Sequence, residues 1–179
     1  ANLPDLVELL SPLPVDLSLT TNGASLGLLA KDLSRAGLRR INISLDTLRR
    51  DRFKELTLRD DLTRVLDGID AALAVGLFPV KINVVVMRDV NDDELVDFAR
   101  FGRERGVTVR FIEFMPLDAD KAWSDTAVVS QDEIVSTVGE IFPLNPLSRT
   151  TAPATRFGYA DGMGEIGVVA SVTQKFCDS

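Results

Sequence analysis

The chain of 179 residues carries 20 lysines and arginines against 27 aspartates and glutamates, a formal net charge of −7, and contains no histidine and one cysteine. Without histidine it offers no imidazole for a catalytic triad or zinc site, and Cys177 alone cannot close a disulfide within the chain or hold a metal. The acidic balance excludes a broad surface for DNA or RNA, although a few local cations could still hold one small anion.

No segment predicts a membrane span or a secretion signal. The longest apolar stretch, near residues 71–80, contains a glycine and a proline and is far shorter than the roughly 20 residues that a spanning helix needs. We therefore expect a cytoplasmic protein. Because the sequence begins Ala-Asn-Leu-Pro without a methionine, we also expect it to be part of a longer chain.

The first 116 residues alternate short β-branched runs with longer amphipathic stretches, which predicts repeated β-α units. After an opening helix near residues 4–10, strands are expected at 16–21, 40–45, 80–87 and 108–114, and helices at 25–36, 60–75 and 92–105. These three helices are followed by Gly37, Gly76 and Gly106, and glycine readily ends a helix in the left-handed conformation. The pattern predicts a parallel sheet covered by helices.

Beyond residue 116 the pattern changes. Residues 117–179 predict a carboxyl-terminal extension with a helix over 131–142, a flexible loop over 148–155 and a hairpin-like β segment that includes 166–172. Four parallel strands are too few to close a barrel, since an eight-stranded barrel takes roughly 250 residues. We therefore expect the chain to be the middle of a larger protein.

Lys81 is the most unusual residue of the predicted strands. Side chains alternate along a strand, so Lys81 shares one face with Asn83, Val85 and Met87. A buried parallel strand is normally aliphatic, so a lysine and an asparagine on one face indicate a polar interior that meets an anion, or a lysine that forms an imine. The alternative is a lysine whose stem reaches solvent at the start of the strand.

Two other strand ends carry polar groups. Thr20-Thr-Asn-Gly closes the first strand and Ser44-Leu-Asp ends the second, at the carboxyl edge where α/β folds hold ligands. Each motif has a structural alternative. Asn22-Gly23 would form an ordinary turn with Ser25 as a helix cap, and Asp46 would cap the helix that follows it.

The fourth predicted strand ends in the run Arg110-Phe-Ile-Glu-Phe-Met-Pro. Alternation places Phe111, Glu113 and Met115 on one face. Met115 would either contact a ligand or fill the core. The acidic clusters Asn91-Asp-Asp-Glu and Arg59-Asp-Asp are interpreted as caps of helix N-termini without a further function.

Several runs form an ordered set: Leu19-Thr-Thr-Asn-Gly, Ile41-Asn-Ile-Ser-Leu-Asp-Thr-Leu, Val80-Lys-Ile-Asn, Val109-Arg-Phe-Ile-Glu-Phe-Met-Pro, Gly164-Glu-Ile-Gly-Val-Val-Ala-Ser-Val and Phe176-Cys. Together they resemble the radical S-adenosylmethionine GTP cyclases of molybdenum-cofactor biosynthesis, the MoaA family. The resemblance covers nearly the whole chain. It implies a lyase with a partial six-unit (β/α) barrel, parallel strands inside and helices outside, plus a carboxyl-terminal β extension.

The resemblance also implies what this enzyme binds. Its cofactors would be S-adenosylmethionine and two 4Fe-4S clusters, its substrate GTP, and its partners a second copy of itself and a downstream pterin-forming enzyme. Thr20 and Lys81 would contact GTP, Ser44 and Met115 would contact S-adenosylmethionine, and Cys177 would be one of three ligands of the second cluster. The family's Cys-x-x-x-Cys-x-x-Cys motif is absent from these residues, so we expect the chain to be inactive alone.

Two alternatives from other classes stay open. A class I aldolase-like (β/α) enzyme would use Lys81 as a Schiff base in an apolar pocket and would need no cysteine. A non-catalytic α/β interaction module would dock a partner through its acidic surface and appended hairpin, because a fold alone does not fix a function.

Overall fold

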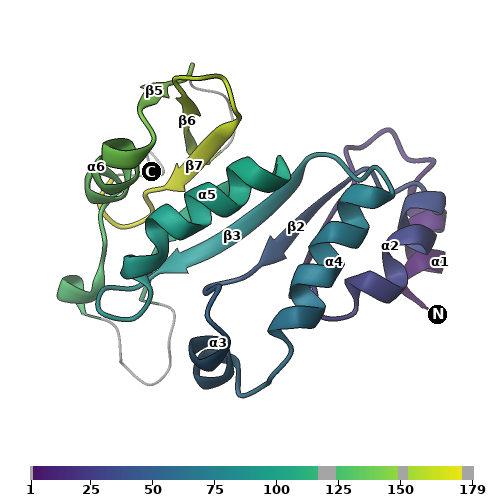
Figure 1. The fold of residues 1–179 in the computed structure, drawn as a ribbon. Helices are drawn as coiled ribbons and strands as arrows, with labels where there is room; N and C mark the ends of the chain where they lie inside the picture. The colour runs from purple at the N-terminus through teal and green to yellow at the C-terminus, as the bar shows by residue number, and fades with distance from the viewer. Residues whose placement is uncertain (1, 117–123, 149–152, 175–179) are drawn as a thin grey trace. The chain divides into compact units, whose positions relative to one another are not determined.

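A computed structural model describes residues 2–116, 124–148 and 153–174 (Figure 1). The chain divides into two compact units. Unit 1 comprises residues 1–45 and 49–82, and unit 2 comprises residues 46–48 and 83–179. The predicted α/β class is confirmed, because parallel strands alternate with helices and antiparallel strands follow toward the carboxyl terminus.

Unit 1 holds the first β-α repeats, and its strand order is β1-β2-β3. Its elements are α1 (Leu3–Leu10), β1 (Ser18–Thr21), α2 (Leu26–Arg35), β2 (Arg40–Ser44), α3 (Arg50–Thr57), α4 (Leu62–Ala74) and the start of β3 (Val80–Val86). Strands β1 and β2 pair in parallel, with Ser18 opposite Arg40 and Thr21 opposite Ile43. The core of this unit contains fully buried side chains of Leu33, Leu38, Ile41, Ile43, Ile69 and Leu77.

Glycines shape unit 1 in two ways, by ending helices and by allowing a close contact. Gly37 and Gly76 follow α2 and α4 with φ of +104° and +78°, which confirms the predicted helix stops. Gly23, with φ of +79°, lies where an added Cβ would meet Ile43 and Val65 at 3.0 Å. An added Cβ on Gly68 of α4 would lie only 2.7 Å from the carbonyl oxygen of Gly23. The missing side chains therefore let α4 pack directly against the turn after β1.

Unit 2 combines the end of β3 with the carboxyl-terminal strands, in the order β3-β4-β7-β6-β5. Its elements are η1 (Asp92–Glu94), α5 (Leu95–Arg105), β4 (Thr108–Glu113), η2 (Asp125–Ala127), α6 (Gln131–Ile141), β5 (Leu144–Pro146), β6 (Thr155–Tyr159) and β7 (Glu165–Val169). The expected hairpin is present as the antiparallel pair β6–β7. Strand β7 also pairs in parallel with β4, Val109 opposite Ile166, so the hairpin extends the sheet.

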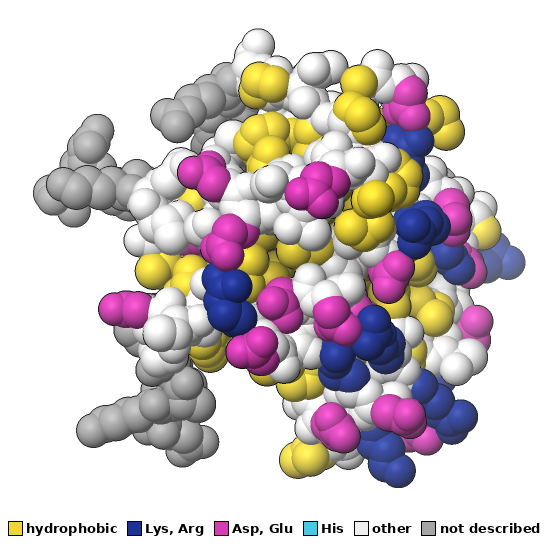
Figure 2. Space-filling view, turned by 60° about the vertical axis from the view of Figure 1, so that its left-hand side comes forward, with side chains coloured by type: hydrophobic (Ala, Val, Ile, Leu, Met, Phe, Trp, Pro, Cys, Tyr) yellow, Lys and Arg dark blue, Asp and Glu magenta, His cyan; other side chains and the backbone are white. Residues whose placement is uncertain are grey.

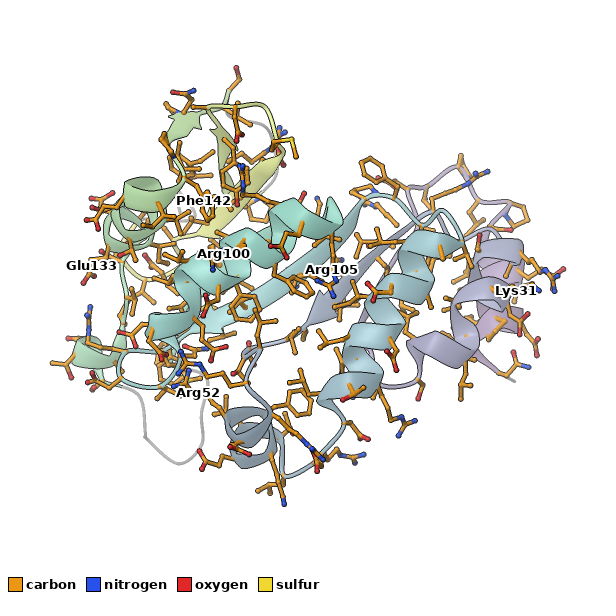
Figure 3. All side chains as sticks on the ribbon, in the orientation of Figure 1. Lys31, Arg52, Arg100, Arg105, Glu133 and Phe142 are labelled. Atoms are coloured by element: carbon orange, nitrogen blue, oxygen red, sulfur yellow. The ribbon has the colours of Figure 1, made fainter. Side chains whose placement is uncertain are left out.

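An arginine joins the helices of unit 2 to its hairpin. The Arg103 guanidinium on α5 lies 4.7 Å from the ring centroid of Phe142 and 4.5 Å from that of Tyr159, and it pairs with Asp161. This pairing lowers the pKa of Asp161 to about 2, whereas burial raises the pKa of Tyr159 to about 12. Arg100, labelled with Phe142 in Figure 3, lies over the same ring at 5.8 Å.

Acidic and basic side chains are interspersed on the face drawn in Figure 2. Several acidic and basic side chains of the described residues form ion pairs, for example Arg50 with Asp60 and Arg88 with Glu133. The described residues contain no helix long and apolar enough to cross a membrane.

Candidate functional site

Unit 1 presents a polar face at the ends of β1 and β2. Ile41 and Ile43 are fully buried, so alternation turns Asn42 and Ser44 to the opposite face of β2. Thr20 lies opposite Asn42, and its hydroxyl accepts a hydrogen bond from the Asn42 side chain at 3.3 Å. Thr20 and Ser44 are both exposed. The structure therefore places these two predicted contacts on one accessible face of the parallel pair.

The turn after β1 is held by its own side chains. The Thr21 hydroxyl accepts from the backbone N–H of Gly23, and the Asn22 side-chain oxygen accepts from the N–H of Ala24, each at 3.2 Å. Ser25 occupies the cap position of α2, but its side chain makes no capping hydrogen bond. The structural alternative thus accounts for residues 21–24, while Thr20 remains outside that turn.

Strand β3 has one aliphatic and one polar face, as its alternation predicts. Val80, Ile82, Val84 and Val86 are buried, whereas Lys81 and the other residues of its face are half-buried. On that face, the side-chain oxygen of Asn83 is buried and accepts no hydrogen bond from any described residue. Buried polar atoms are normally hydrogen-bonded, so this oxygen requires a donor from outside the described residues.

Of the two alternatives for Asp46, the one in which it caps the following helix is wrong. Its Oδ1 accepts instead from the backbone N–H of Val85 at 2.8 Å, and α3 begins after Arg49, whose side chain makes no cap. Burial raises the pKa of Asp46, and the Val85 N–H offsets part of that rise. The Asp46 carboxylate therefore takes the place that the backbone carbonyl of a neighbouring strand would occupy as acceptor for the Val85 N–H.

The prediction that Asn91-Asp-Asp-Glu only caps a helix is also wrong for its two ends. Asn91 is buried, and its amide donates to the carbonyl oxygens of Asp46 (2.7 Å) and Val85 (2.8 Å). Glu94 is fully buried and accepts from the Thr47 hydroxyl and the Leu48 N–H, both at 2.6 Å. These side chains hold residues 46–48, a role that no local sequence pattern indicated.

In the second acidic cluster, Asp60 binds the guanidinium of Arg50 through both carboxylate oxygens, at 2.8 and 2.9 Å. Asp61 stands at the cap position of α4 without a capping hydrogen bond from its side chain. The cap interpretation is therefore wrong here too, since the first aspartate forms an ion pair.

At the end of β4 the alternation is confirmed for the strand itself. Val109, Phe111 and Glu113 are fully buried on one face. Glu113 was missed as a functional residue, although a carboxylate on an otherwise apolar strand face was a signal that it must bind something. Met115 lies two residues beyond the strand and is half-buried.

Cys177, the predicted cluster ligand, lies outside the described residues. Within residues 2–116, 124–148 and 153–174, no three or more acidic or cysteine side chains are gathered so that they could hold a metal ion. The described part of the chain therefore does not itself supply the ligands for an iron–sulfur cluster.

Two family models match the chain. Residues 1–102 match the Radical SAM superfamily, and residues 107–179 match Molybdenum Cofactor Synthesis C. Among solved structures, that of TYW1 with a lysine-pyruvate adduct bound is similar in fold, with a TM-score of 0.58 and 13% identity over 90% of this chain and 50% of that chain. This likeness and the superfamily match show a partial-barrel-like α/β fold.

Several curated relatives are named GTP 3',8-cyclase, and three of them illustrate the similarity. The protein of Moorella thermoacetica is 46% identical over 98% of this chain and 55% of its own length. Those of Acidothermus cellulolyticus and Rhodopirellula baltica are 45% and 44% identical over 99% and 97% of this chain, in each case half of the relative. The chain thus spans about half the length of the curated relatives it matches.

Proposed function

Because the chain belongs to the radical SAM superfamily, we propose that it is the central part of a GTP 3',8-cyclase of molybdenum-cofactor biosynthesis. The three relatives of that name described above are 44% to 46% identical to nearly all of it, and its second part matches Molybdenum Cofactor Synthesis C. Membership of the superfamily implies S-adenosylmethionine and a 4Fe-4S cluster as cofactors. A second cluster, with Cys177 as one ligand, belongs to the proposal.

The observation that carries the proposal is the polar face of β3. Lys81 supplies a cation there, and the buried oxygen of Asn83 lacks a donor among the described residues. A nucleotide matches both groups, since its phosphates take the ammonium and its hydroxyl or amino groups donate to the amide oxygen. We assign Lys81 and Thr20 to GTP, and Ser44 and Met115 to S-adenosylmethionine.

The cofactors supply radical chemistry when they are bound, and the residues of this chain would bind and orient GTP and S-adenosylmethionine. Lys81 would neutralise phosphate charge in a protein of net charge −7 that otherwise repels anions. The Thr20 hydroxyl, already oriented by Asn42, retains its own proton for donation to an acceptor on GTP. Ser44 lies on the same accessible face of the pair and would contact S-adenosylmethionine.

The first test removes the charge on β3. Lys81→Met should abolish the rise in melting temperature that GTP produces, because bound ligand stabilises the folded state by mass action. Lys31→Met, on the exposed surface of α2, is the matched control and should leave the rise intact. An unchanged GTP response in Lys81→Met would contradict the assignment of Lys81. A borohydride-trapped adduct on Lys81 with a carbonyl compound would instead support the aldolase-like alternative.

The second test uses the unsatisfied oxygen. Asn83→Leu should stabilise the unliganded chain, since it removes a buried acceptor that lacks a partner, yet it should weaken nucleotide binding. Calorimetric titration with GTP and with S-adenosylmethionine separates the two ligands. If the substitution leaves both affinities unchanged, the polar face of β3 is not the binding surface.

We further propose that the longer protein is a cytoplasmic homodimer whose product passes to a pterin-forming enzyme. The 179 residues alone should not turn over GTP, because one cysteine cannot hold a cluster. Anaerobic reconstitution followed by iron analysis and a turnover assay tests this expectation. Turnover by these residues alone would contradict it.

A further inference from the structure

Glu113 ends β4, and its side chain is fully buried. Its carboxylate accepts four hydrogen bonds. Oε1 accepts from the backbone N–H of Gln131 at 3.0 Å and from the Thr173 hydroxyl. Oε2 accepts from the N–H groups of Val172 (2.9 Å) and Thr173 (2.8 Å). One carboxylate therefore binds both the first residue of α6 and the turn that follows β7.

The register of the sheet explains how Glu113 reaches this turn. Strands β4 and β7 are parallel, and Ile112 lies opposite Val169, so both strands end at the same edge of the sheet. The chain then turns at residues 171–174, and the Ser171 hydroxyl donates to the carbonyl oxygen of Glu113 at 3.4 Å. Both the backbone and the side chain of Glu113 thus bind this turn.

The contacts differ from those of an ordinary turn. The N–H groups of Val172 and Thr173 lie beyond the last residue of β7 and take Glu113 as acceptor, in place of a sheet partner or a side chain of the turn. The Gln131 N–H is one of the free donors at a helix N-terminus, where a carboxylate is favourable. All these donors come from residues at least 18 positions away from Glu113.

Two residues of the proposed function flank these contacts along the chain. Met115 follows Glu113 by two positions, and Cys177 follows Thr173 by four. The carboxylate of Glu113 binds Thr173, so it fixes the starting points of two short segments, the one from Glu113 to Met115 and the one from Thr173 to Cys177. Glu113 can position both segments without contacting a ligand itself.

We propose that Glu113 is a positioning residue, which fixes the turn 171–173 on the end of β4 and so sets the point from which the chain runs to Cys177. The inference rests on the proposed function only for the role of Cys177. The contacts of Glu113 with the turn do not depend on it.

The test compares two buried carboxylates in the same 179-residue chain by amide hydrogen exchange. Glu113→Gln keeps the side-chain volume but replaces one acceptor oxygen by an amide that faces N–H donors. It should speed exchange at Val172 and Thr173 roughly tenfold. Glu94→Gln is the matched control. It should speed exchange at Leu48, which Glu94 binds, and leave Val172 and Thr173 unchanged.

A second readout addresses position rather than stability. Cys177 is the one cysteine in the sequence, so a nitroxide label reports on it alone. We expect Glu113→Gln to change the mobility of the label and Glu94→Gln to leave it unchanged. If both variants change it equally, or if the exchange at Val172 responds while the label does not, the positioning role is refuted.

Should Glu113→Gln fail to fold, Thr173→Val decides the question, since it removes one donor and keeps both backbone N–H groups. It should speed exchange at Val172 and change the label less strongly than the loss of the carboxylate would. No effect of Thr173→Val on either readout would overturn the proposal. Neither measurement uses GTP, so a failure of GTP binding and a failure of this inference are distinguishable.

Discussion

The turn after β1 and the turn after β7 are stabilised in opposite ways. The first is held from within, by Thr21 and Asn22, each of which accepts an N–H two residues further along the chain. The second is held from a distance, by the carboxylate of Glu113, 59 and 60 residues before the N–H groups it accepts. A turn held by its own side chains can be recognised from neighbouring residues in the sequence, whereas a turn held by a side chain far away in the sequence cannot.

The largest expected effect breaks the remote contact. Glu113→Ala should destabilise the chain by about 3 kcal/mol, because it leaves the buried N–H of Gln131 and the part-buried donors of Val172 and Thr173 without their acceptor and opens a cavity. Urea unfolding measures the change. Glu140→Ala, on the exposed side of α6, should stay within about 0.5 kcal/mol of the parent chain. If the two variants are equally stable, the turn after β7 does not depend on Glu113.

The next largest effect concerns the turn after β1, which its own side chains hold. Gly23→Ala should cost about 2 kcal/mol, because it combines a left-handed φ with contacts of 3.0 Å to Ile43 and Val65. Gly76→Ala separates the two causes, since Gly76 has nearly the same φ but no atom within 4 Å of an added Cβ. It should cost about 1 kcal/mol. Equal melting temperatures for the two variants would show that crowding at Gly23 adds nothing.

A smaller effect uses pH to probe a remote acceptor. Burial raises the pKa of Asp46, so its ionisation opposes folding, and the favourable contribution present at acidic pH is lost as pH rises through the folded pKa. Asp46→Asn keeps an oxygen for the Val85 N–H and should stabilise the chain at pH 7 by about 1 kcal/mol or less. The difference should disappear toward pH 3. A destabilised variant at pH 7 would contradict this account.

The smallest effect probes a local acceptor, and its sign is opposite. Glu133 accepts from the N–H of Ser130, and this bond, with the Arg88 guanidinium, lowers the pKa of Glu133 to about 2. Its stabilisation is present above the ordinary pKa near 4.5 and is lost as pH falls toward 2.

Glu133→Gln should therefore cost less than about 1 kcal/mol at pH 7, since the side chain is half exposed. Thermal unfolding from pH 7 to pH 2 should show the two chains converging. A gap that widens in acid would refute the assignment.

Much of the fold could be predicted, because its rules are local. The positive φ values of Gly37, Gly76 and Gly106 confirm the helix stops, and alternation along β3 placed Lys81 on the half-buried face. The parallel pairing also brings Thr20 and Ser44 to one face, although their roles in binding stay a prediction.

The side chains that hold distant segments could not be predicted. Asn91 and Glu94 resemble helix caps because they precede α5, yet each also bonds a residue far away in the sequence: Asn91 bonds Asp46, 45 residues away, and Glu94 bonds Thr47, 47 residues away. Capping a helix and binding residues 46–48 call for the same residue types. The sequence does not tell which loop lies beside η1, so it cannot distinguish these two roles. Glu113 gave a weak signal, an acid on an apolar strand face, but nothing in the sequence identified residues 171–173 as its partners.

The approach of Gly68 to Gly23 bears on how the sequence can change over time. A side chain at Gly23 would meet the side chains of Ile43 and Val65, and mutations that shorten these two side chains would relieve the contacts. A side chain at Gly68 would lie 2.7 Å from the backbone oxygen of Gly23. No substitution can remove a backbone oxygen. A genetic selection should therefore recover suppressors of the crowding at Gly23 by trimming its neighbours, whereas suppressors of Gly68→Ala would have to move the whole turn.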